Sequence, residues 1–490
     1  MSESRLSDHF SVPVCNFVAG TWRDAVSGAR FVKRAPATGE VLTEVAHSAA
    51  ADVDAAVAAA RAQFDGGDWA RLSGAARGRL LYALADLLER DADHFVRLLA
   101  VEQGRPLMEM RMLDLPMSID VLRYFAGWAD KLEGRQIPTG GFMGRPTLNY
   151  TTREPVGVAA LIVPWNAPLM IGLWKLAPAL AAGCAVVLKP SEDAPCALSA
   201  LMDRVAEAGF PPGVVNLVNG MGETGAALVA HPGVDKVSFT GSTAVGRLIA
   251  CEAAPRFKRL TLELGGKAPQ ILCADADLAV AIPGVAMGLF VNQGQTCAAG
   301  TRVLVHRACY DEVVAALAAA AKAITLGDPL EADTRMGALI NAKQRDRVQA
   351  LIESGLTEGA CRVAGDEVVP EKGFFLRPTV FAGGTPEMRL MREEIFGPVG
   401  LVVPFDSDEE AVRLANDTPF GLSASLWTRD LARAHTLAAR LRFGAVAING
   451  WSPLDARLPW GGFGDSGVGR DLSRCALEAY TEEKVVSLVL

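Results

Sequence analysis

One cysteine stands among residues that suit chemistry. Cys297 lies in the segment 290–302, after an apolar, helix-compatible stretch at 285–291, and Gly294 and Gly300 bracket it. Amide side chains at 292, 293 and 295 stand where a core segment would have Leu or Val. A thiolate here could add to a carbonyl carbon, although free cysteines are often buried and inert. Whether this thiol reacts depends on a base, an oxyanion donor and an electron acceptor elsewhere in the chain.

A carboxylate and an amide are candidates for the base and the oxyanion donor. Glu263 lies between two leucines at the end of an apolar stretch, and burial raises the pKa of a carboxyl group toward that of a general base. A buried glutamate that is merely paired would have the same pattern. Asn166 lies between two prolines at the end of an expected strand, where a rigid amide can donate to an oxyanion. An ordinary turn asparagine is the alternative.

Two segments have the residue types of a dinucleotide site. Lys189-Pro-Ser191-Glu192 follows a buried strand, and a carboxylate at such a strand end accepts hydrogen bonds from ribose hydroxyls and repels an added 2′-phosphate. In Phe239–Gly246 a strand enters a Gly-Ser-Thr turn and then a helix, whose free N–H groups can bind phosphate. The spacing matches neither a P-loop nor GxGxxG, so each segment alone is more typical of a turn or a helix start.

A third segment, Glu393-Glu394-Ile-Phe396-Gly-Pro398, could bind ribose hydroxyls through its adjacent acids. Such a pair is more often a solvated helix end. The segment gains meaning only together with the others.

The elements that hold these segments alternate regularly between strand and helix from Val156 to Leu264. The alternation predicts a parallel sheet with helices on both faces, and ligands of such sheets bind at the carboxyl ends of the strands. The expected strands are 158–163, 185–189, 214–218, 236–240 and 259–263, and the expected helices are 169–182, 197–208, 224–230 and 244–253.

Further elements are expected on either side of this unit. Before it, a strand pair is expected at 17–22 and 30–33. A first helix begins at Asp52, and three more span 75–90, 91–104 and 114–133, the last with Gly134 at its end. After it, a second α/β unit comprises 269–273, 278–291, 302–305, 310–324, 342–354, 400–404, 408–416 and 445–449.

Residues 136–153 differ from the rest of the chain. Pro, Gly and Thr interrupt them, and 147–153 alternate as an exposed strand would. The last residues, 485–490, form an apolar strand, and an unaccompanied strand tends to pair with something, for example another subunit. We expect 136–153 to be a two-stranded excursion suited to subunit contacts, and a surface hairpin without a partner is the equal alternative.

The overall composition excludes several classes of protein. The chain has 490 residues, of which 50% are hydrophobic and 21% charged, as in globular proteins of about two to four domains. A net charge of -8 without a basic tract argues against a nucleic-acid partner. A polar, acid-containing start and nine scattered cysteines without a CxxC pair fit the cytoplasm better than export, disulfides or a metal site.

The segment 156–188 is apolar and long enough to suggest a membrane span. Three prolines, Asn166 and Lys175 interrupt it. It therefore predicts a buried strand, turn, helix and strand, and no membrane partner.

Together and in this order, the segments resemble the aldehyde dehydrogenase superfamily over nearly the whole chain. Chance agreement at so many separated places is not credible. The resemblance is carried by Pro164-Trp-Asn166, Lys189-Pro-Ser-Glu192, Phe239-Thr-Gly-Ser-Thr243, Leu262-Glu-Leu-Gly-Gly-Lys267, Gly294-Gln-Thr-Cys297, Glu393-Glu-Ile-Phe-Gly-Pro398 and Ala479-Tyr-Thr-Glu-Glu-Lys484.

The resemblance implies an α/β fold with two Rossmann-like domains, each with a parallel sheet, and a small β excursion for oligomerisation. The cofactor-binding domain would comprise residues 1–135 and 154–263, and the catalytic domain residues 264–462. Residues 136–153 and 463–490 would form the oligomerisation domain of a homodimer or homotetramer.

The resemblance also implies catalytic roles. Cys297 would be the nucleophile and Glu263 the base, and Asn166 with the backbone N–H of Cys297 would hold the oxyanion. Asp471 falls where many relatives carry a glutamate that can join a proton relay, and its shorter side chain departs from that pattern.

The implied cofactor is NAD+, with NADP+ as an alternative. Lys189 and Glu192 would grip the adenosine ribose, Ser242 would face the pyrophosphate, and Glu394 would bind the nicotinamide ribose. The other residues expected at the cofactor are Pro164, Trp165, Ser191, Gly222, Phe239, Gly241, Gly246, Leu264 and Phe396.

These roles describe oxidation of an aldehyde to a carboxylic acid. The thiolate adds to the carbonyl, the thiohemiacetal loses hydride to NAD+, and water activated by Glu263 hydrolyses the thioester. A coenzyme-A-acylating dehydrogenase is disfavoured because Glu263 is retained. A non-catalytic relative is disfavoured because nucleophile, base and oxyanion donor are all present. A cofactor-free cysteine hydrolase lacks a histidine in a comparable motif.

The substrate pocket is less defined by the sequence. Many relatives carry an aromatic residue after Trp-Asn, whereas this chain has Ala167. Its expected lining is Ala167, Leu169, Met170, Trp174, Thr296, Ala298, Leu454 and Trp460. Apart from Arg457, no arginine stands out as a clamp for a carboxylate. We therefore expect aromatic or bulky hydrophobic aldehydes, with a semialdehyde or a broad range of aliphatic aldehydes as the alternative.

Overall fold

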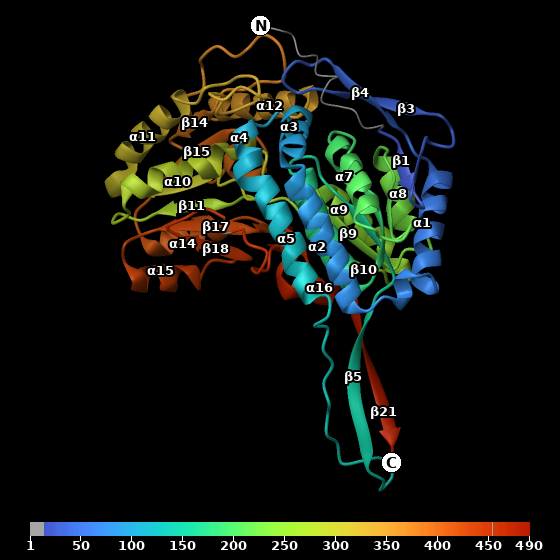
Figure 1. Cartoon of the computed structure of the whole chain (residues 1–490). Coiled ribbons are helices and arrows are strands. Elements are labelled where there is room, and N and C mark those ends of the chain that lie inside the picture. Colours follow the sequence, from blue (N-terminus) through green and yellow to red (C-terminus); the bar gives the residue numbers. More distant parts are fainter. Residues whose placement is uncertain (1–13, 453) are drawn as a thin grey trace.

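The computed structural model describes residues 14–452 and 454–490. They form two α/β units side by side and a long two-stranded arm that projects away from both (Figure 1). The expected α/β fold with two largely parallel sheets is confirmed.

The first sheet is parallel at its centre and antiparallel at its edges. Its central parallel strands are mostly apolar and buried along their whole length, as expected for a sheet covered on both sides. In spatial order they are β2 (Thr21–Arg23), β1 (Asn16–Val18), β8 (Val215–Leu217), β7 (Ala185–Lys189), β6 (Val158–Ile162), β9 (Lys236–Thr240), β10 (Arg259–Glu263) and β20 (Gly467–Val468).

Helices cover both faces of this sheet. Ala159 and Leu161 of β6 pack into one core cluster, and Val158 and Ala160 pack into another, because successive side chains of a strand point to opposite faces. The first cluster includes α2 (Gly74–Arg90), α3 (Ala92–Gln103), α5 (Leu115–Trp128), α6 (Pro168–Ala182) and α7 (Cys196–Glu207), and the second includes α1 (Ala50–Asp65), α8 (Gly222–Ala230) and α9 (Thr243–Ala253).

The expected pairing of 17–22 with 30–33 is wrong. Residues 16–23 form a hairpin of their own, because Ala19 and Gly20 adopt left-handed backbone angles and reverse the chain between β1 and β2. The strand β3 (Arg30–Arg34) instead pairs with β4 (Val41–Ala46).

The single helix expected at 114–133 is also wrong in its bounds. The short helix α4 (Leu107–Glu109) leads into a π-helical turn, Met110–Asp114, and α5 ends at Trp128. The helical stretch 107–128 is continuous, so Pro116 lies inside it and cannot donate an N–H to the preceding turn. The wider π turn just before it accommodates that loss. Gly134 does not end the helix. A side chain there would overlap the carbonyl oxygen of Thr151, so this glycine permits a close contact.

The second sheet is parallel except for β13 at its edge. In spatial order its strands are β13 (Cys361–Ala364), β14 (Thr379–Ala382), β15 (Val399–Phe405), β12 (Arg302–His306), β11 (Pro269–Leu272), β17 (Ser423–Trp427) and β18 (Ala445–Ile448). Its helices are α10 (Leu278–Phe290), α11 (Tyr310–Lys322), α12 (Ala342–Thr357), α13 (Arg389–Arg392), α14 (Asp408–Asn416) and α15 (Leu431–Ala438).

Several elements of this second unit are missing from the sequence-based expectation. They are β13, β14, β17, α13 and α15. The strand β17 contains two serines and β14 has only four residues, so neither has the long β-branched pattern that marks a strand in a sequence. Neighbouring strands bury them nonetheless.

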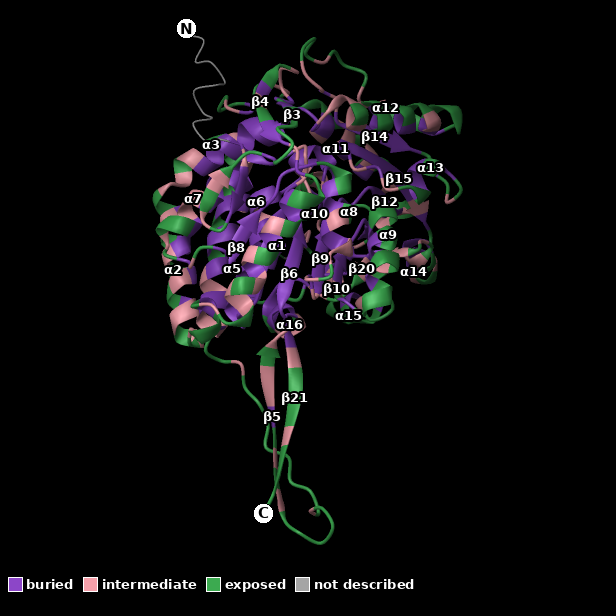
Figure 2. Ribbon diagram, turned by 90° about the vertical axis from the view of Figure 1, so that its right-hand side faces the viewer, coloured by how far each residue is buried: buried purple, intermediate pink, exposed green. Residues whose placement is uncertain are grey.

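The arm consists of β5 (Thr147–Pro155) and β21 (Thr481–Val489), which pair antiparallel over their whole length. The C-terminal strand therefore pairs within its own chain. Figure 2 shows that the arm is exposed or partly exposed along most of its length, while the sheets of the body are buried. Within the range 463–490, β20 pairs with β10 in the first sheet, and α16 (Ser473–Ala479) packs against α6.

The remaining strands are β16 (Phe420–Gly421) and β19 (Phe463–Gly464), which pair with each other. Residues 156–188 form β6, α6 and β7, as expected. Over residues 14–452 and 454–490, no helix combines the length and apolar character needed to cross a membrane.

Candidate active site

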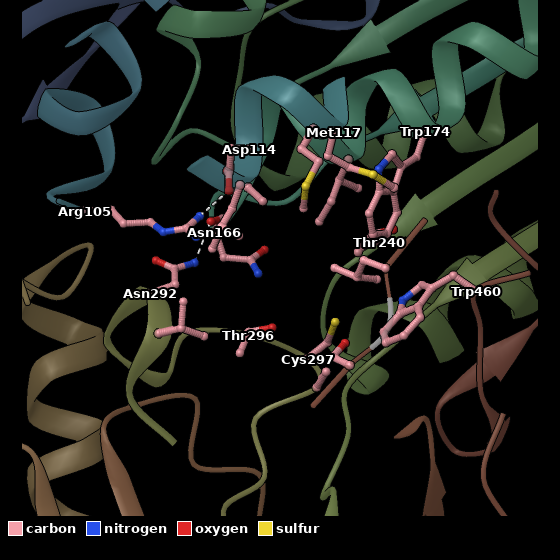
Figure 3. A pocket seen from close by; sticks show the side chains of 18 of the residues that line it. Arg105, Asp114, Met117, Asn166, Trp174, Thr240, Asn292, Thr296, Cys297 and Trp460 are labelled. Carbon is pink, nitrogen blue, oxygen red and sulfur yellow. Dashed lines mark hydrogen bonds and ion pairs between the residues drawn. The ribbon is translucent and has the colours of Figure 1, made fainter. Parts of the chain in front are cut away.

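The segments that carry Asn166, Glu263 and Cys297 meet at a cavity of about 320 Å³ between the two α/β units. Asn166 follows β6 and Glu263 ends β10, so both stand at the carboxyl edge of the first sheet. Cys297 comes from the second unit and lines the same cavity (Figure 3). Residues far apart in the sequence are thus brought together where ligands of parallel sheets bind.

The loop that carries the thiol has an unusual backbone. After α10 ends, Asn292, Gln293 and Gly294 adopt left-handed angles, with φ of 51°, 54° and 68°. Asparagine and glycine tolerate this conformation better than other residues. A side chain at Gly294 would overlap the carbonyl of Gly397, so glycine is required there. This tight turn brings Cys297 back into the cavity.

The thiol of Cys297 is half-buried and lies near two carboxyl groups. Burial, and then the negative charges of Glu263 and Glu394, raise the pKa of Cys297 above that of a free thiol. The resting thiol is therefore protonated, and its reaction requires a group that removes the proton.

Asn166 is held against the thiol loop by hydrogen bonds. Its Nδ2 donates to the carbonyl oxygen of Gln295 at 3.0 Å. Asn292 Nδ2 donates in turn to the carbonyl oxygen of Asn166 at 2.7 Å (Figure 3). It also donates to the carbonyl oxygen of Gln295 at 3.1 Å. Asn292 thus joins the amide expected to hold an oxyanion to the loop that carries the thiol.

A buried charge network continues from this clamp to the π-helical turn. The backbone N–H of Asn292 donates to Glu109 at 3.0 Å, and Glu109 pairs with Arg105 at 2.6 Å. Arg105 also pairs with Asp114 at 2.6 Å. The sequence analysis missed these three charged residues, because nothing in their local pattern distinguishes them from charges on a solvated helix.

Glu263 is buried at the base of the cavity and accepts a hydrogen bond from Trp460 Nε1 at 3.2 Å. Burial raises its pKa well above the ordinary value, and the charge of Asp471 adds to the increase. Lys175 and the hydrogen bond from Trp460 act in the opposite direction. A carboxyl group with a raised pKa can exchange protons near neutral pH.

Asp471 is buried behind Trp460 rather than at the cavity wall. Its carboxylate pairs with Lys175 Nζ at 2.7 Å, and Lys175 also donates to Ser238 Oγ at 3.2 Å. The backbones of Asp471 and Trp460 exchange two hydrogen bonds. The structure thus joins Asp471 to Glu263 through the shared neighbours Trp460 and Lys175.

A second cavity of about 300 Å³ adjoins the first at the thiol. Cys297, Asn166, Ile171 and Thr240 line both cavities. The residues expected at a cofactor that line it are Pro164, Trp165, Gly241, Ser242, Leu264, Glu394 and Phe396. The sequence analysis missed Thr240, Gln344 and Arg347, which also line it.

The second cavity has the donors and acceptors that a dinucleotide needs. Ser242 caps α9, whose first N–H groups can bind phosphate. Glu394 accepts from the N–H of Gly266 at 3.0 Å and offers a carboxylate for ribose hydroxyls. Thr240 Oγ1 is buried and lacks a partner within the described residues. These groups fit a phosphate- and ribose-containing ligand.

The helix α12 holds one wall of this cavity. Gln344 Nε2 donates to the carbonyl of Phe396 at 2.7 Å, and Arg347 donates to the carbonyl of Ile395 at 2.9 Å. Phe396 has a left-handed φ of 55°, and its ring meets Trp165 edge-on at 5.2 Å. The hydrogen bonds from α12 to these carbonyls therefore help to hold Phe396 in a left-handed conformation that costs free energy.

The other residues expected at the cofactor lie outside this cavity. Lys189 Nζ lies 3.7 Å from Glu192 at the end of β7, and Gly222 begins α8. Gly246 lies behind the cavity-lining Leu264 and allows it to pack closely, and the ring of Phe239 packs against the cavity-lining Gly241. Ser191 lies between Lys189 and Glu192 and accepts from the N–H of Asp193.

The apolar lining expected for the first cavity is present, except for Leu169. The expected residues that line it are Ala167, Met170, Trp174, Thr296, Ala298, Leu454 and Trp460. Leu169 instead lies in the core. Arg457 is exposed and paired with Asp455 at 2.7 Å, so it offers no clamp in the cavity. Lining residues that the sequence analysis missed include Met112, Leu113, Met117, Met287 and Val291.

Known proteins are similar to this chain in sequence and in fold. The sequence pattern described as "Aldehyde dehydrogenase family" matches residues 22–486. Retinaldehyde dehydrogenase 3 of Homo sapiens is 46% identical over 97% of this chain and 92% of that protein. An aldehyde dehydrogenase of Bacillus cereus, solved with NAD+, has a TM-score of 0.97 at 43% identity, covering 100% of this chain and 99% of that one. The indole-3-acetaldehyde dehydrogenase of P. syringae, solved with NAD+ and IAA, has a TM-score of 0.96 at 40% identity over 99% and 98% of the two chains.

Proposed function

The chain belongs to the aldehyde dehydrogenase family, and we propose that it oxidises an aldehyde to the carboxylic acid with NAD+ as the hydride acceptor. One observation carries the proposal. A thiol, a carboxyl group and an amide from separate segments line a single cavity, and a second cavity with phosphate and ribose partners adjoins it at the thiol.

Cys297 is the proposed nucleophile. Its sulfur forms a bond to the aldehyde carbon, and the carbonyl oxygen becomes an oxyanion. The Nδ2 of Asn166 and the backbone N–H of Cys297 donate to that oxygen. Asn166 also donates to Gln295, and Asn292 binds the Asn166 carbonyl, so this donor is fixed before the substrate arrives. Fixed donors stabilise developing charge without reorganising.

Glu263 is the proposed base. It accepts the thiol proton, directly or through water, because both groups line one cavity and Cys297 is protonated at rest. NAD+ supplies the hydride acceptor that the oxidation of the thiohemiacetal to a thioester requires. Glu263 then removes a proton from water, whose oxygen attacks the thioester carbon, and the carbon–sulfur bond breaks to release the acid.

Asp471 and Lys175 are proposed to pass protons to or from Glu263. Their buried ion pair stands behind Trp460, which donates to Glu263. The carboxylate of Asp471 helps to keep the pKa of Glu263 raised, so that Glu263 releases as well as accepts a proton during turnover.

NAD+ would lie in the second cavity and extend toward the end of β7. Glu394 would bind one ribose, the start of α9 at Ser242 the pyrophosphate, and Glu192 with Lys189 the other ribose. The relatives solved with NAD+ support this cofactor. Glu192 would repel a 2′-phosphate.

A Glu192→Ser variant is therefore expected to lose much of its preference for NAD+ over NADP+ in kcat/KM. An unchanged preference would exclude this role of Glu192.

The proposed substrates are aromatic or bulky hydrophobic aldehydes. Ala167 leaves space beside the thiol, and the rest of the wall is mostly aliphatic, methionine and tryptophan side chains. Arg105, at the wall, is already bound to two carboxylates, so it does not attract the carboxylate of a semialdehyde. Relatives named for retinaldehyde and indole-3-acetaldehyde support bulky substrates.

Absorbance of NADH tests the reaction. Aldehyde and NAD+ should yield NADH without coenzyme A, and Cys297→Ala should yield none. NADH formation that requires coenzyme A would identify an acylating enzyme, and a lack of NADH formation with every aldehyde would contradict the proposal.

The substrate class is tested by a series of kcat/KM values. The values for benzaldehyde and phenylacetaldehyde should exceed those for acetaldehyde and succinate semialdehyde. The reverse order would contradict the proposed substrate class.

We further propose that the arm joins subunits of a homodimer or homotetramer, and that the chain acts in the cytoplasm. Residues 1–135 with 154–263 would form the cofactor-binding domain, 264–462 the catalytic domain, and 136–153 with 463–490 the oligomerisation domain. The exposed, extended arm supports the assembly role.

A further inference from the structure

A groove of about 370 Å³ lies beside the substrate cavity, between α10, α11 and the segment of α4 and the π-helical turn. Its walls include Met108, Phe290, Ala320 and Ile324. Sequence analysis did not single out any of these residues for function. The groove contains none of the catalytic residues, so the proposed chemistry does not account for it.

The groove and the substrate cavity share a boundary. Met112 and Leu113 of the π-helical turn line both spaces, and so do Met287 and Val291 on the facing segment. The side chains of these four residues are therefore all that stands between the groove and the substrate cavity. Two of the four are methionines, whose unbranched side chains change conformation at low cost.

The boundary is apolar and open to solvent. Its methionines Met112 and Met287 are 67% and 45% exposed, and Met108, on the groove side, is 47% exposed. Apolar side chains gathered at the mouth of a cavity indicate a surface that meets an apolar ligand or partner. Continuity with the substrate cavity favours a ligand that occupies both spaces.

The charges around the groove also point to an apolar occupant. Glu109 lies on its wall, but it pairs with Arg105 and accepts from the backbone of Asn292. Arg335, the other charged residue on the wall, is exposed. The surface between them consists of methionine, leucine, isoleucine, valine, phenylalanine and alanine, which offers no side-chain hydrogen-bond donor to a polar ligand.

We propose that the groove holds the distal part of a long-chain aliphatic aldehyde whose carbonyl lies at Cys297. The inference rests on the proposed aldehyde oxidation and adds long-chain aliphatic aldehydes to its substrate class. The substrate passes between Met112 and Met287, and its remaining methylene groups lie against Phe290, Ala320 and Ile324. The residues beyond the boundary thus select for chain length, whereas those inside it bind the reacting end.

Substitution of Ala320 tests the groove without altering the substrate cavity. Ala320 is half-buried and lines the groove alone, and its neighbour Ala319 is exposed and lines neither space. An Ala320→Trp side chain would fill the groove, and Ala319→Trp is the matched control. The measurement is the ratio of kcat/KM for dodecanal to kcat/KM for benzaldehyde, which fits within the first cavity.

The wild-type ratio should fall about tenfold in Ala320→Trp and stay unchanged in Ala319→Trp. A methylene in an open groove gains about half the stabilisation of full burial, or roughly twofold in kcat/KM, so that several displaced methylenes give this loss. If Ala320→Trp does not fold, Ile324→Gln makes the groove polar instead and should also lower the ratio.

An equal ratio in wild type, Ala320→Trp and Ile324→Gln would overturn the proposed groove. That result is distinct from a failure of the proposed function. If benzaldehyde and dodecanal both yield no NADH with the wild-type enzyme, aldehyde oxidation itself is wrong. If benzaldehyde is oxidised and chain length has no effect, only the groove is wrong.

Discussion

At the scale of single residues, Trp460 lowers the proton affinity of the proposed base, Glu263. Its Nε1 donates to Glu263, which favours the ionised carboxylate and lowers the pKa that burial raises. Glu263 acts as a base only when ionised, so the rate falls as the pH drops through its pKa. Trp460→Phe removes the hydrogen bond, and the acid limb of the pH profile of kcat should move to higher pH.

The matched control for this change is Trp174→Phe. Trp174 lines the same cavity and meets Trp460 edge-on at 6.5 Å. Its Nε1 has no partner among the residues that the structure describes. This control should therefore leave the acid limb in place. A shift of equal size in both variants would show that loss of ring packing, and not loss of the hydrogen bond, moves the pKa.

Asn292 is expected to act through Asn166. Asn292→Ala removes two buried hydrogen bonds, to the carbonyls of Asn166 and Gln295. We expect kcat to fall about tenfold to a hundredfold, with KM little changed, because a fixed oxyanion donor contributes about 2.7–4 kcal/mol. If the two residues act as a unit, the double variant with Asn166→Ala should be no slower than Asn166→Ala alone. Additive losses would show independent roles.

Short sequence patterns predicted the residues that carry chemistry, but not those that hold them. Cys297, Glu263 and Asn166 stand in distinctive segments and meet at one cavity. Arg105 and Glu109 lie in no such pattern. Their importance comes from the hydrogen bond between Glu109 and Asn292, which are 183 positions apart in the sequence. Such a contact exists only in the folded chain.

At the scale of elements, the π-helical turn is stabilised by Arg105. This residue is buried and pairs with Glu109 and Asp114. Arg105→Met would leave two carboxylates without their cation, at a cost of about 3–5 kcal/mol in the free energy of unfolding. Denaturant unfolding followed by fluorescence should detect this loss.

Arg111 provides the control within the same turn. It pairs with Asp93 at 2.6 Å, but both side chains are mostly exposed. Exposed pairs contribute about 0.2–1 kcal/mol, so Arg111→Met should hardly change the unfolding midpoint. Equal losses in the two variants would refute the structural role of the buried pair.

The sequence predicted elements best where one pattern decided their structure. The strands β7, β9 and β10 have the expected bounds because apolar residues run between turn residues. The π-helical turn was not predictable, since it depends on how Pro116, Arg105 and the neighbouring thiol loop are accommodated together. The strand β17 has an ordinary serine-rich sequence and is a strand because β11 and β18 pair with it.

At the scale of the whole molecule, the arm is the feature that a partner would cover. Val485 and Leu488 of β21 are 66% and 53% exposed. If the arm joins subunits, Val485→Asp combined with Leu488→Asp should yield a smaller assembly in light scattering, since buried carboxylates are costly. The exposed Val368→Asp, outside the arm, should leave the mass unchanged. An unchanged mass in the arm variant would contradict this assembly.

The sequence predicted the exposed character of this arm but not the pairing within it. An alternating strand and an apolar terminal strand were both recognisable. That β21 pairs with β5 over residues 481–489 depends on contacts across more than three hundred positions, which no local pattern specifies.

The hydrogen bond from the backbone N–H of Asn292 to the carboxylate of Glu109 crosses from one α/β unit to the elements that cover the other. Any hinge motion that separates the units has to break it. The exchange of the Asn292 amide hydrogen for deuterium therefore measures how often the cleft opens. A bound dinucleotide, which would contact both units, should slow that exchange. The exchange rate of this one amide therefore reports on the opening of the active site.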